Sequence, residues 1–223
     1  MKKNYLPVFA AAAIFLSGCG STVDSGNIHS YPFKTAKIEY SISGTTEGKS
    51  VVYIKGDQYM RESHIVFHKA TGDEKQNNIY MDDLKNIYSI NLDQKTGSGY
   101  ANPLGEILKT VPPEKREQVL NNIAAGLAPD AAATQTLNPS GTMTVAGQQC
   151  DVYQRGDLGE ICLWHTIPLK TAVSIPDFGL SNSTVAVSIQ TDIDLPDNVF
   201  EVPAGINLIK IDINGKTNPT QQP

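Results

Sequence analysis

The stretch KIEYSISGTTEGKSVVYIK, residues 37–55, decides the fold class. Ile38, Tyr40 and Ile42 alternate with polar residues, which is the period-two pattern of a strand with one buried face. A turn bounded by two glycines follows, and a second strand-prone run, residues 51–54, leads the chain back. The segment therefore predicts two antiparallel strands joined by a short connection.

Further strand-prone runs continue this pattern on both sides of the middle of the chain. Turn residues such as Gly72-Asp73 and Asp82-Asp83 separate them at short intervals. The order predicts a mainly β (α+β) fold built as a meander of short antiparallel strands. The runs are residues 59–62, 65–67, 79–81, 87–90, 143–145, 171–175, 185–193 and 208–213.

A helical insertion, residues 103–127, interrupts the strands. Its apolar residues recur at helical spacing on both sides of Pro112-Pro113, which ends one helix and begins the next. The apolar stripe has two interpretations: it completes the core, or it forms a lid over a lipid cavity. In the second interpretation the residues that line the cavity are Leu104, Ile107, Leu108, Leu120 and Ile123.

The amino terminus carries an export signal. Residues 1–18 combine Lys2 and Lys3 with an apolar run of about eleven residues, too short for a membrane span of about twenty residues. The run ends in Leu16-Ser17-Gly18-Cys19, which resembles the bacterial lipobox. That resemblance implies cleavage before Cys19, a diacylglycerol on its sulfur, and attachment to the membrane through this lipid.

The lipobox resemblance also implies a location. Gly20, rather than Asp, follows the lipidated cysteine, which favours the outer membrane facing the periplasm if the host is Gram-negative. Residues 19–31 then predict a lipidated amino terminus and a flexible tether, because they are polar and lack periodicity.

Two further cysteines remain in this oxidising compartment. Cys150 and Cys162 flank a turn that contains Gly156, and a hairpin folded about this glycine places them opposite one another. We expect a cross-strand disulfide that stabilises the fold by roughly 3 kcal/mol. The alternative is a redox pair or a metal site.

Short motifs in the second half of the chain resemble the half-barrel superfamily of lipoprotein-localisation carriers and receptors (LolA/LolB-like) and related periplasmic domains of unknown function. The resemblance implies a strongly curved antiparallel sheet of about 10–11 strands around an apolar concavity capped by helices. The resemblance covers about residues 36–213, and we expect one domain over residues 32–215. Residues 216–223 are polar and contain two prolines, which predicts a disordered tail. The motifs are Gly147-x-x-Cys150-x-x-Tyr153, Cys162-x-Trp164, Ile167-Pro168-Leu169-Lys170 and LPDNVFEVPAG at 195–205.

Composition and motifs exclude several classes of function. The net charge of −5 argues against nucleic acid as a partner. The chain has no G-x-S-x-G, P-loop or H-E-x-x-H motif, so we expect neither an enzyme nor a cofactor. His64 and His68 have the spacing of a metal pair on a helix, but on a strand they would lie about 13 Å apart. We therefore expect no metal site.

Two functions stay open at this point. In the first, the protein is a non-enzymatic lipoprotein that binds or chaperones an acyl chain, a lipid or a lipoprotein, with large aliphatic residues facing inward from the strands. In the second, the core is filled and the protein is an interaction or assembly subunit of the envelope.

Overall fold

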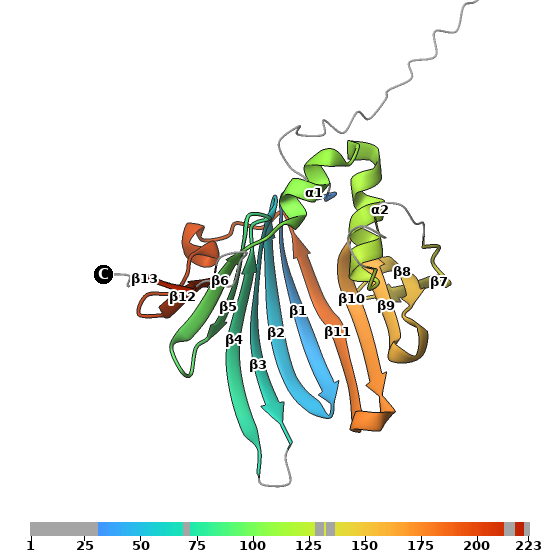
Figure 1. Ribbon diagram of the computed structural model, residues 1–223. Helices are drawn as coiled ribbons and strands as arrows, with labels where there is room; N and C mark the ends of the chain where they lie inside the picture. The colour runs from blue at the N-terminus through green and yellow to red at the C-terminus, as the bar shows by residue number, and fades with distance from the viewer. Residues whose placement is uncertain (1–30, 69–71, 128–131, 133–136, 212–216, 221–223) are drawn as a thin grey trace, which may run out of the picture.

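The computed structural model describes residues 31–68, 72–127, 132, 137–211 and 217–220. They form one curved, unclosed sheet of 13 strands with two helices, an open half-barrel that confirms the predicted fold class (Figure 1). The predicted leader, Cys19 and the tether up to residue 30 lie outside the described residues. No helix within the described ranges is long and apolar enough to cross a membrane.

Six strands precede the helices and seven follow them. The first group is β1 (Thr35–Gly44), β2 (Thr46–Lys55), β3 (Gln58–Phe67), β4 (Glu74–Asp82), β5 (Asn86–Asn91) and β6 (Thr96–Ala101). The helices are α1 (Leu104–Thr110) and α2 (Pro113–Ala124). The second group is β7 (Gly141–Val145), β8 (Gln148–Gln154), β9 (Gly159–Trp164), β10 (Ile167–Ile175), β11 (Leu180–Thr191), β12 (Asn207–Ile211) and β13 (Thr217–Thr220).

The order of strands in space differs from their order in sequence at two places. The sheet runs β13-β12-β6-β5-β4-β3-β2-β1-β11-β10-β9-β8-β7. Strand β11 pairs with β1, so the first strand lies in the interior of the sheet, and β12 pairs in parallel with β6. All other neighbours are antiparallel, as the meander predicts.

The strand count exceeds the predicted 10–11. Strand β6, with the sequence TGSGYA, has no apolar alternation that could reveal it in the sequence. Strand β13, Thr217–Thr220, pairs with β12, so the prediction of a disordered tail over residues 216–223 is wrong for this strand. Both strands are held by backbone pairing to a neighbour, which a polar sequence can supply as well as an apolar one.

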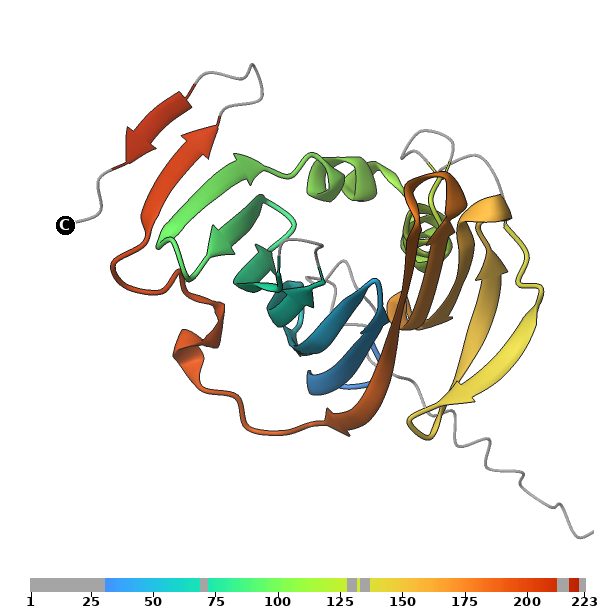
Figure 2. The ribbon, with the colours of Figure 1, turned by 90° about the horizontal axis from the view of Figure 1, so that it is seen from below.

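Two sets of side chains alternate along β3 to β5. One set, which includes Met60, Ile79, Met81 and Ile90, is buried against the chain that connects β11 to β12. This connection, residues 192–206, carries the LPDNVFEVPAG motif, and it crosses the sheet on the side opposite the helices (Figure 2). Its residues in this core are Val199, Phe200, Val202 and Ile206. We call the covered side the outer face.

The other set lies on the inner face, toward the helices. Cross-strand pairing joins Ala36, Ile54, Tyr59, Asp82 and Ile87 into one row across β1 to β5. The next row contains Ile38, Val52, Arg61, Tyr80 and Ser89. In these two rows the inner face is therefore aliphatic on β1 and β2 and becomes mainly polar and aromatic from β3 onward, with Ile87 as the exception.

The two helices are connected by side-chain and backbone contacts as well as by sequence. Leu108 and Val111 pack against Val119 and Leu120 in one buried cluster. The Arg116 Nε–H donates to the carbonyl oxygens of Leu108 and Val111, both at 3.1 Å. Both oxygens lie at the carboxyl end of α1, where backbone donors are scarce. The Leu108 oxygen also accepts from the Val111 N–H at 3.2 Å, so the arginine adds a second donor there and supplies one to Val111.

Candidate functional site

A cavity of about 320 Å³ lies between the inner face and the helices. Aliphatic and small residues from the helices, the β4–β5 turn and the start of β10 form one part of its lining: Leu84, Leu104, Leu120, Ile123, Ala124, Ile167 and Pro168. Aromatic and polar residues form the other part: Tyr31, Asp57, Tyr59, Tyr80, Asp82 and Thr166. Its volume is at the lower end of the range for small-molecule sites, about 300–1,000 Å³.

The structure divides the five predicted lining residues. Leu104, Leu120 and Ile123 do line the cavity. Leu108 does not, because its side chain is 0% exposed in the cluster between the two helices. Ile107 is half-buried and is also absent from the lining. The prediction is therefore wrong for both residues. For Leu108 the reason is that α1 buries part of its apolar stripe against α2.

Three tyrosines form the aromatic part of the lining. The rings of Tyr59 and Tyr80 meet edge to face, with centroids 6.0 Å apart and planes at 73°. Burial raises the pKa of Tyr31, Tyr59 and Tyr80 above the ordinary value of a phenol, so all three hydroxyls stay neutral at physiological pH. The wall thus offers uncharged rings and hydroxyl groups to the cavity.

Hydrogen bonds from neighbouring residues hold the Asp82 carboxylate in place at the cavity. The Asn102 Nδ2 amide donates to its two oxygens at 3.0 and 3.1 Å. The backbone N–H of Leu84 donates to Oδ1 at 2.7 Å. These donors are all neutral, so they fix the carboxylate without cancelling its negative charge.

The same turn positions the apolar side of the cavity. Leu84 has a φ of 64°, a left-handed conformation that is uncommon outside glycine. The Asp83 Oδ1 accepts from the backbone N–H groups of Lys85 and Asn86, which holds the turn closed. Leu84 is therefore presented toward α1, where its side chain is buried and lines the cavity.

Gly105 lets α1 approach this turn, and its replacement gives a testable prediction. A Cβ at Gly105 would lie 2.2 Å from the Leu84 carbonyl oxygen, so α1 would have to move away. We expect Gly105→Ala to lower the free energy of unfolding by about 1–3 kcal/mol in urea denaturation. Gly141→Ala is the control: nothing lies within 4 Å of its Cβ, and we expect a change below about 0.5 kcal/mol. Equal effects of the two substitutions would contradict the close approach.

Polar residues continue beyond the cavity on the inner face of β3 to β6. They include Arg61, Ser63, Asn78, Ser89 and Ser98, as the strand registers require. The expectation of large aliphatic inward-facing residues is therefore confirmed for β1 and β2 and wrong for most positions of β3 to β6, where Ile65 and Ile87 are exceptions. The apolar residues of those later strands are used on the outer face, under the connection from β11 to β12.

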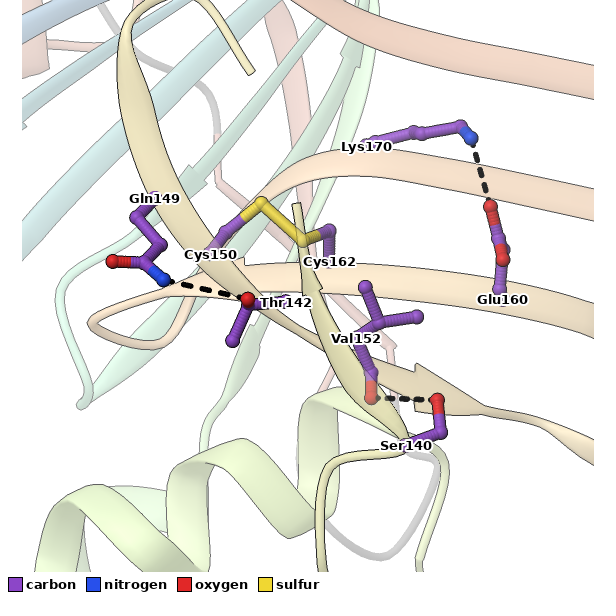
Figure 3. Close-up of a disulfide and its surroundings, with 8 residues drawn as sticks. All are labelled: Ser140, Thr142, Gln149, Cys150, Val152, Glu160, Cys162 and Lys170. Atoms are coloured by element: carbon purple, nitrogen blue, oxygen red, sulfur yellow. Dashed lines mark hydrogen bonds and ion pairs between the residues drawn. A yellow bond between two sulfur atoms is a disulfide. The ribbon is translucent and has the colours of Figure 1, made fainter. Parts of the chain in front are cut away.

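The disulfide joins Cys150 and Cys162, as predicted, with their Cα atoms 5.5 Å apart (Figure 3). The register differs from the prediction, because Val152 rather than Cys150 lies opposite Cys162. The hairpin turns about Asp157, in the short 3-10 helix Gly156–Leu158, and not about Gly156. A shift of one residue at the turn moves the opposite partner by two, so the disulfide runs diagonally between β8 and β9.

His64 and His68 have separate partners. His64 lies in β3 with its Nδ1 2.6 Å from the Asn77 Oδ1, and the His68 Nδ1 lies 3.0 Å from the Asp73 Oδ1. The strand that was expected at these histidines is present and contains His64, while His68 directly follows its last residue, Phe67. Among the residues that the structure describes, no three His, Cys, Asp or Glu side chains gather as a metal site would require.

No protein-family model and no curated protein matches the sequence. Among solved structures, an uncharacterized conserved protein from Thermus thermophilus is 10% identical, with a TM-score of 0.47, over 80% of this chain and 91% of that one. MucB is 12% identical, with a TM-score of 0.37, over 77% of this chain. The chain spans 58% of the MucB structure. Likeness at this level assigns no function, and the lipoprotein-localisation resemblance stays a prediction.

Proposed function

We propose that this protein is a non-enzymatic lipoprotein, anchored through Cys19 in the outer membrane if the host is Gram-negative, that binds a hydrophobic ligand on the periplasmic side. The ligand is an acyl chain, or the acyl part of a lipid or lipoprotein. The cavity under α1 and α2 is the observation that carries this proposal, because its volume of about 320 Å³ and its aliphatic side suit a hydrocarbon chain.

The energetics favour such a ligand. Each buried CH₂ contributes roughly 0.8 kcal/mol, less the cost of ordering the chain. An apolar cavity of about 150 Å³ is enough to bind benzene, so this one accepts a chain of several carbons but not a complete lipoprotein anchor of two or three acyl chains. We infer that one chain, or the end of one chain, enters the cavity.

The alternative, an envelope interaction subunit with a filled core, has support from the other half of the sheet. There Phe33, Ile38, Val152 and Leu169 belong to one closely packed cluster that includes the disulfide. A protein of this kind would bind its partners on its surface and would not need the cavity.

A substitution at the cavity separates the two functions. The chain from Gly20 to Pro223, which keeps every described residue, is purified without detergent and titrated with the neutral apolar fluorophore N-phenylnaphthylamine. We expect saturable binding, displaced by the nonionic amphiphile dodecyl maltoside. Ile123→Trp fills the cavity and should weaken this binding by at least about tenfold, since the indole occupies the space of the ligand. Lys115→Trp, at an exposed position of α2, is the matched control and should bind normally.

The fluorescence test is completed by native mass spectrometry of the same preparation. Co-purified lipid on the unmodified chain, and none on Ile123→Trp, would support the proposal. Absence of both lipid and fluorophore binding would overturn it in favour of the interaction subunit.

A further inference from the structure

We propose that the cavity selects an amphiphile with a positively charged head group, an ammonium or alkylammonium, whose alkyl chain lies along α1 and α2. The inference rests on the proposed function, since it assigns the chemistry of a ligand in the same cavity. The head group is placed at Tyr59, Tyr80 and Asp82, and the chain at Leu104, Leu120 and Ile123.

The charged side chains that line the cavity are acidic and would attract a cation. Two carboxylates, Asp57 and Asp82, contribute to the lining, and no Lys, Arg or His is among the described residues that do so. The hydrogen-bond donors that hold Asp82 are neutral groups: the Asn102 amide, the Leu84 N–H and the Tyr80 hydroxyl. A cation that enters the cavity therefore meets a fixed negative charge, at a partly enclosed site where screening by solvent is reduced.

Arg61, on the inner face beside the cavity, already has several partners, one of which is the Tyr59 hydroxyl, which accepts a hydrogen bond from it. The Arg61 Nε–H donates to the Ser50 Oγ at 3.2 Å, and its guanidinium lies over the Tyr40 ring, 5.8 Å from the centroid. Arg61 is adjacent to Tyr59 and Tyr80 in the sheet but is not part of the cavity lining. Among the described residues, the cavity wall thus offers no arginine or lysine to an anionic head group.

The aromatic rings of the cavity lining also suit a cation. Cations bind over the faces of tyrosine rings within about 6 Å of the centroid, and several such rings together recognise quaternary ammonium groups. Tyr59 and Tyr80 stand at 73° to one another, and Tyr31 adds a third ring to the lining. Tyr80 is 38% exposed despite its position on the inner face, so a ligand can reach its ring.

The aliphatic residues lie on a different side of the cavity from the tyrosines and Asp82, which indicates that the ligand also carries an alkyl chain. Leu104, Leu120 and Ile123 come from the helices, while the tyrosines and Asp82 come from β3, β4 and the chain before β1. The cavity therefore has one wall for a hydrocarbon and one wall for a cation. A molecule that satisfies both walls is an amphiphile with an ammonium head, either a free alkylammonium or a lipid whose head group ends in an amine.

A head-group series tests the proposal at constant chain length. Dodecyltrimethylammonium, dodecyl maltoside and dodecanoate, each below its micelle concentration, compete for N-phenylnaphthylamine on the chain from Gly20 to Pro223. We expect the cation to bind at least about tenfold more tightly than the maltoside, and dodecanoate to bind most weakly. Dodecanoyl lysophosphatidylethanolamine is the fourth probe: tight binding of this lysolipid indicates a membrane lipid as the source, and binding of the free cation alone indicates a free alkylammonium.

Variants assign the selectivity to the two named features. Asp82→Asn keeps the shape of the side chain. It should weaken binding of dodecyltrimethylammonium about tenfold and change binding of dodecyl maltoside less than about twofold. Tyr80→Leu should also weaken binding of the cation, whereas Tyr80→Phe keeps the aromatic ring and should bind the cation as tightly as the unmodified chain does. Asp194→Asn, at an exposed position, makes the same change in net charge and should have no effect.

The outcomes distinguish the two levels of inference. Equal binding of the three dodecyl probes, or a preference for dodecanoate, overturns the cationic ligand and leaves a hydrophobic ligand in place. Absence of binding by every probe overturns both. Loss of maltoside and cation binding together in Asp82→Asn would show that this residue holds the cavity open, and would also contradict its role as the charge partner.

Discussion

Removal of the Cys150–Cys162 disulfide should lower the free energy of unfolding by about 3 kcal/mol. The disulfide closes a short loop, with a sequence separation of 12, and so restricts the unfolded chain. Its two residues are 2% and 1% exposed and belong to the cluster that joins β8 and β9 to β1 and β2. Loss of the disulfide should therefore destabilise the whole half of the sheet that contains Cys150 and Cys162.

Denaturation of the reduced protein measures the disulfide itself, because reduction keeps both side chains in place. For a domain of this size the midpoint of thermal unfolding should fall by about 6–12 °C. The variant Cys150→Ala/Cys162→Ala should lose at least as much stability, since it also removes two buried sulfur atoms. A reduced protein as stable as the oxidised one would show that the pairing contributes nothing to the fold.

Replacement of Cys19 by alanine should prevent lipid anchoring, so that the protein is either soluble in the periplasm or retained as an uncleaved precursor in the cytoplasmic membrane. The proposed lipidation attaches the diacylglycerol to this thiol, and two or three acyl chains provide stable anchoring where one chain gives only marginal binding. The measurement is fractionation of cells together with mass spectrometry of the amino-terminal peptide, which should carry lipid only on the unmodified chain.

Ser17→Ala is the matched control for this experiment, because it keeps a small residue inside the lipobox and leaves the cysteine in place. It should be processed and anchored normally. If Cys19→Ala remained in the membrane fraction and was cleaved like the unmodified chain, the lipoprotein interpretation would be refuted.

Much of the fold follows from local patterns. The alternation at Ile38, Tyr40 and Ile42 predicts β1, and the apolar stripe broken by Pro112-Pro113 predicts α1 and α2. The pairing of Cys150 with Cys162 follows from the turn between two strand-prone runs, although its register does not. These features depend on neighbours close in sequence, so the sequence contains enough information to predict them.

The candidate site depended on contacts that are distant in sequence. Tyr59 and Tyr80 belong to runs that were predicted as strands, and Asp82 to a predicted turn that the structure places at the end of β4. Leu104, Leu120 and Ile123 meet them only because the helices fold back over the inner face. The tyrosines could have been noticed as residues of one period-two set, interleaved with Met60, Ile79 and Met81. The sequence does not show that residues 192–206 cover the outer face. Without that information, one would assign the more apolar set to the concave inner face.

The sequence by itself determined that β3 to β5 present two different faces, because side chains on a strand alternate with a period of two. Only the tertiary structure decided which face lies inside. The chain after β11 crosses the outer face on its way to β12 and buries the apolar set there with Val199, Phe200 and Ile206. Burial against that connection leaves the tyrosines, Arg61 and Asp82 on the inner face, and the cavity takes its polar wall from them.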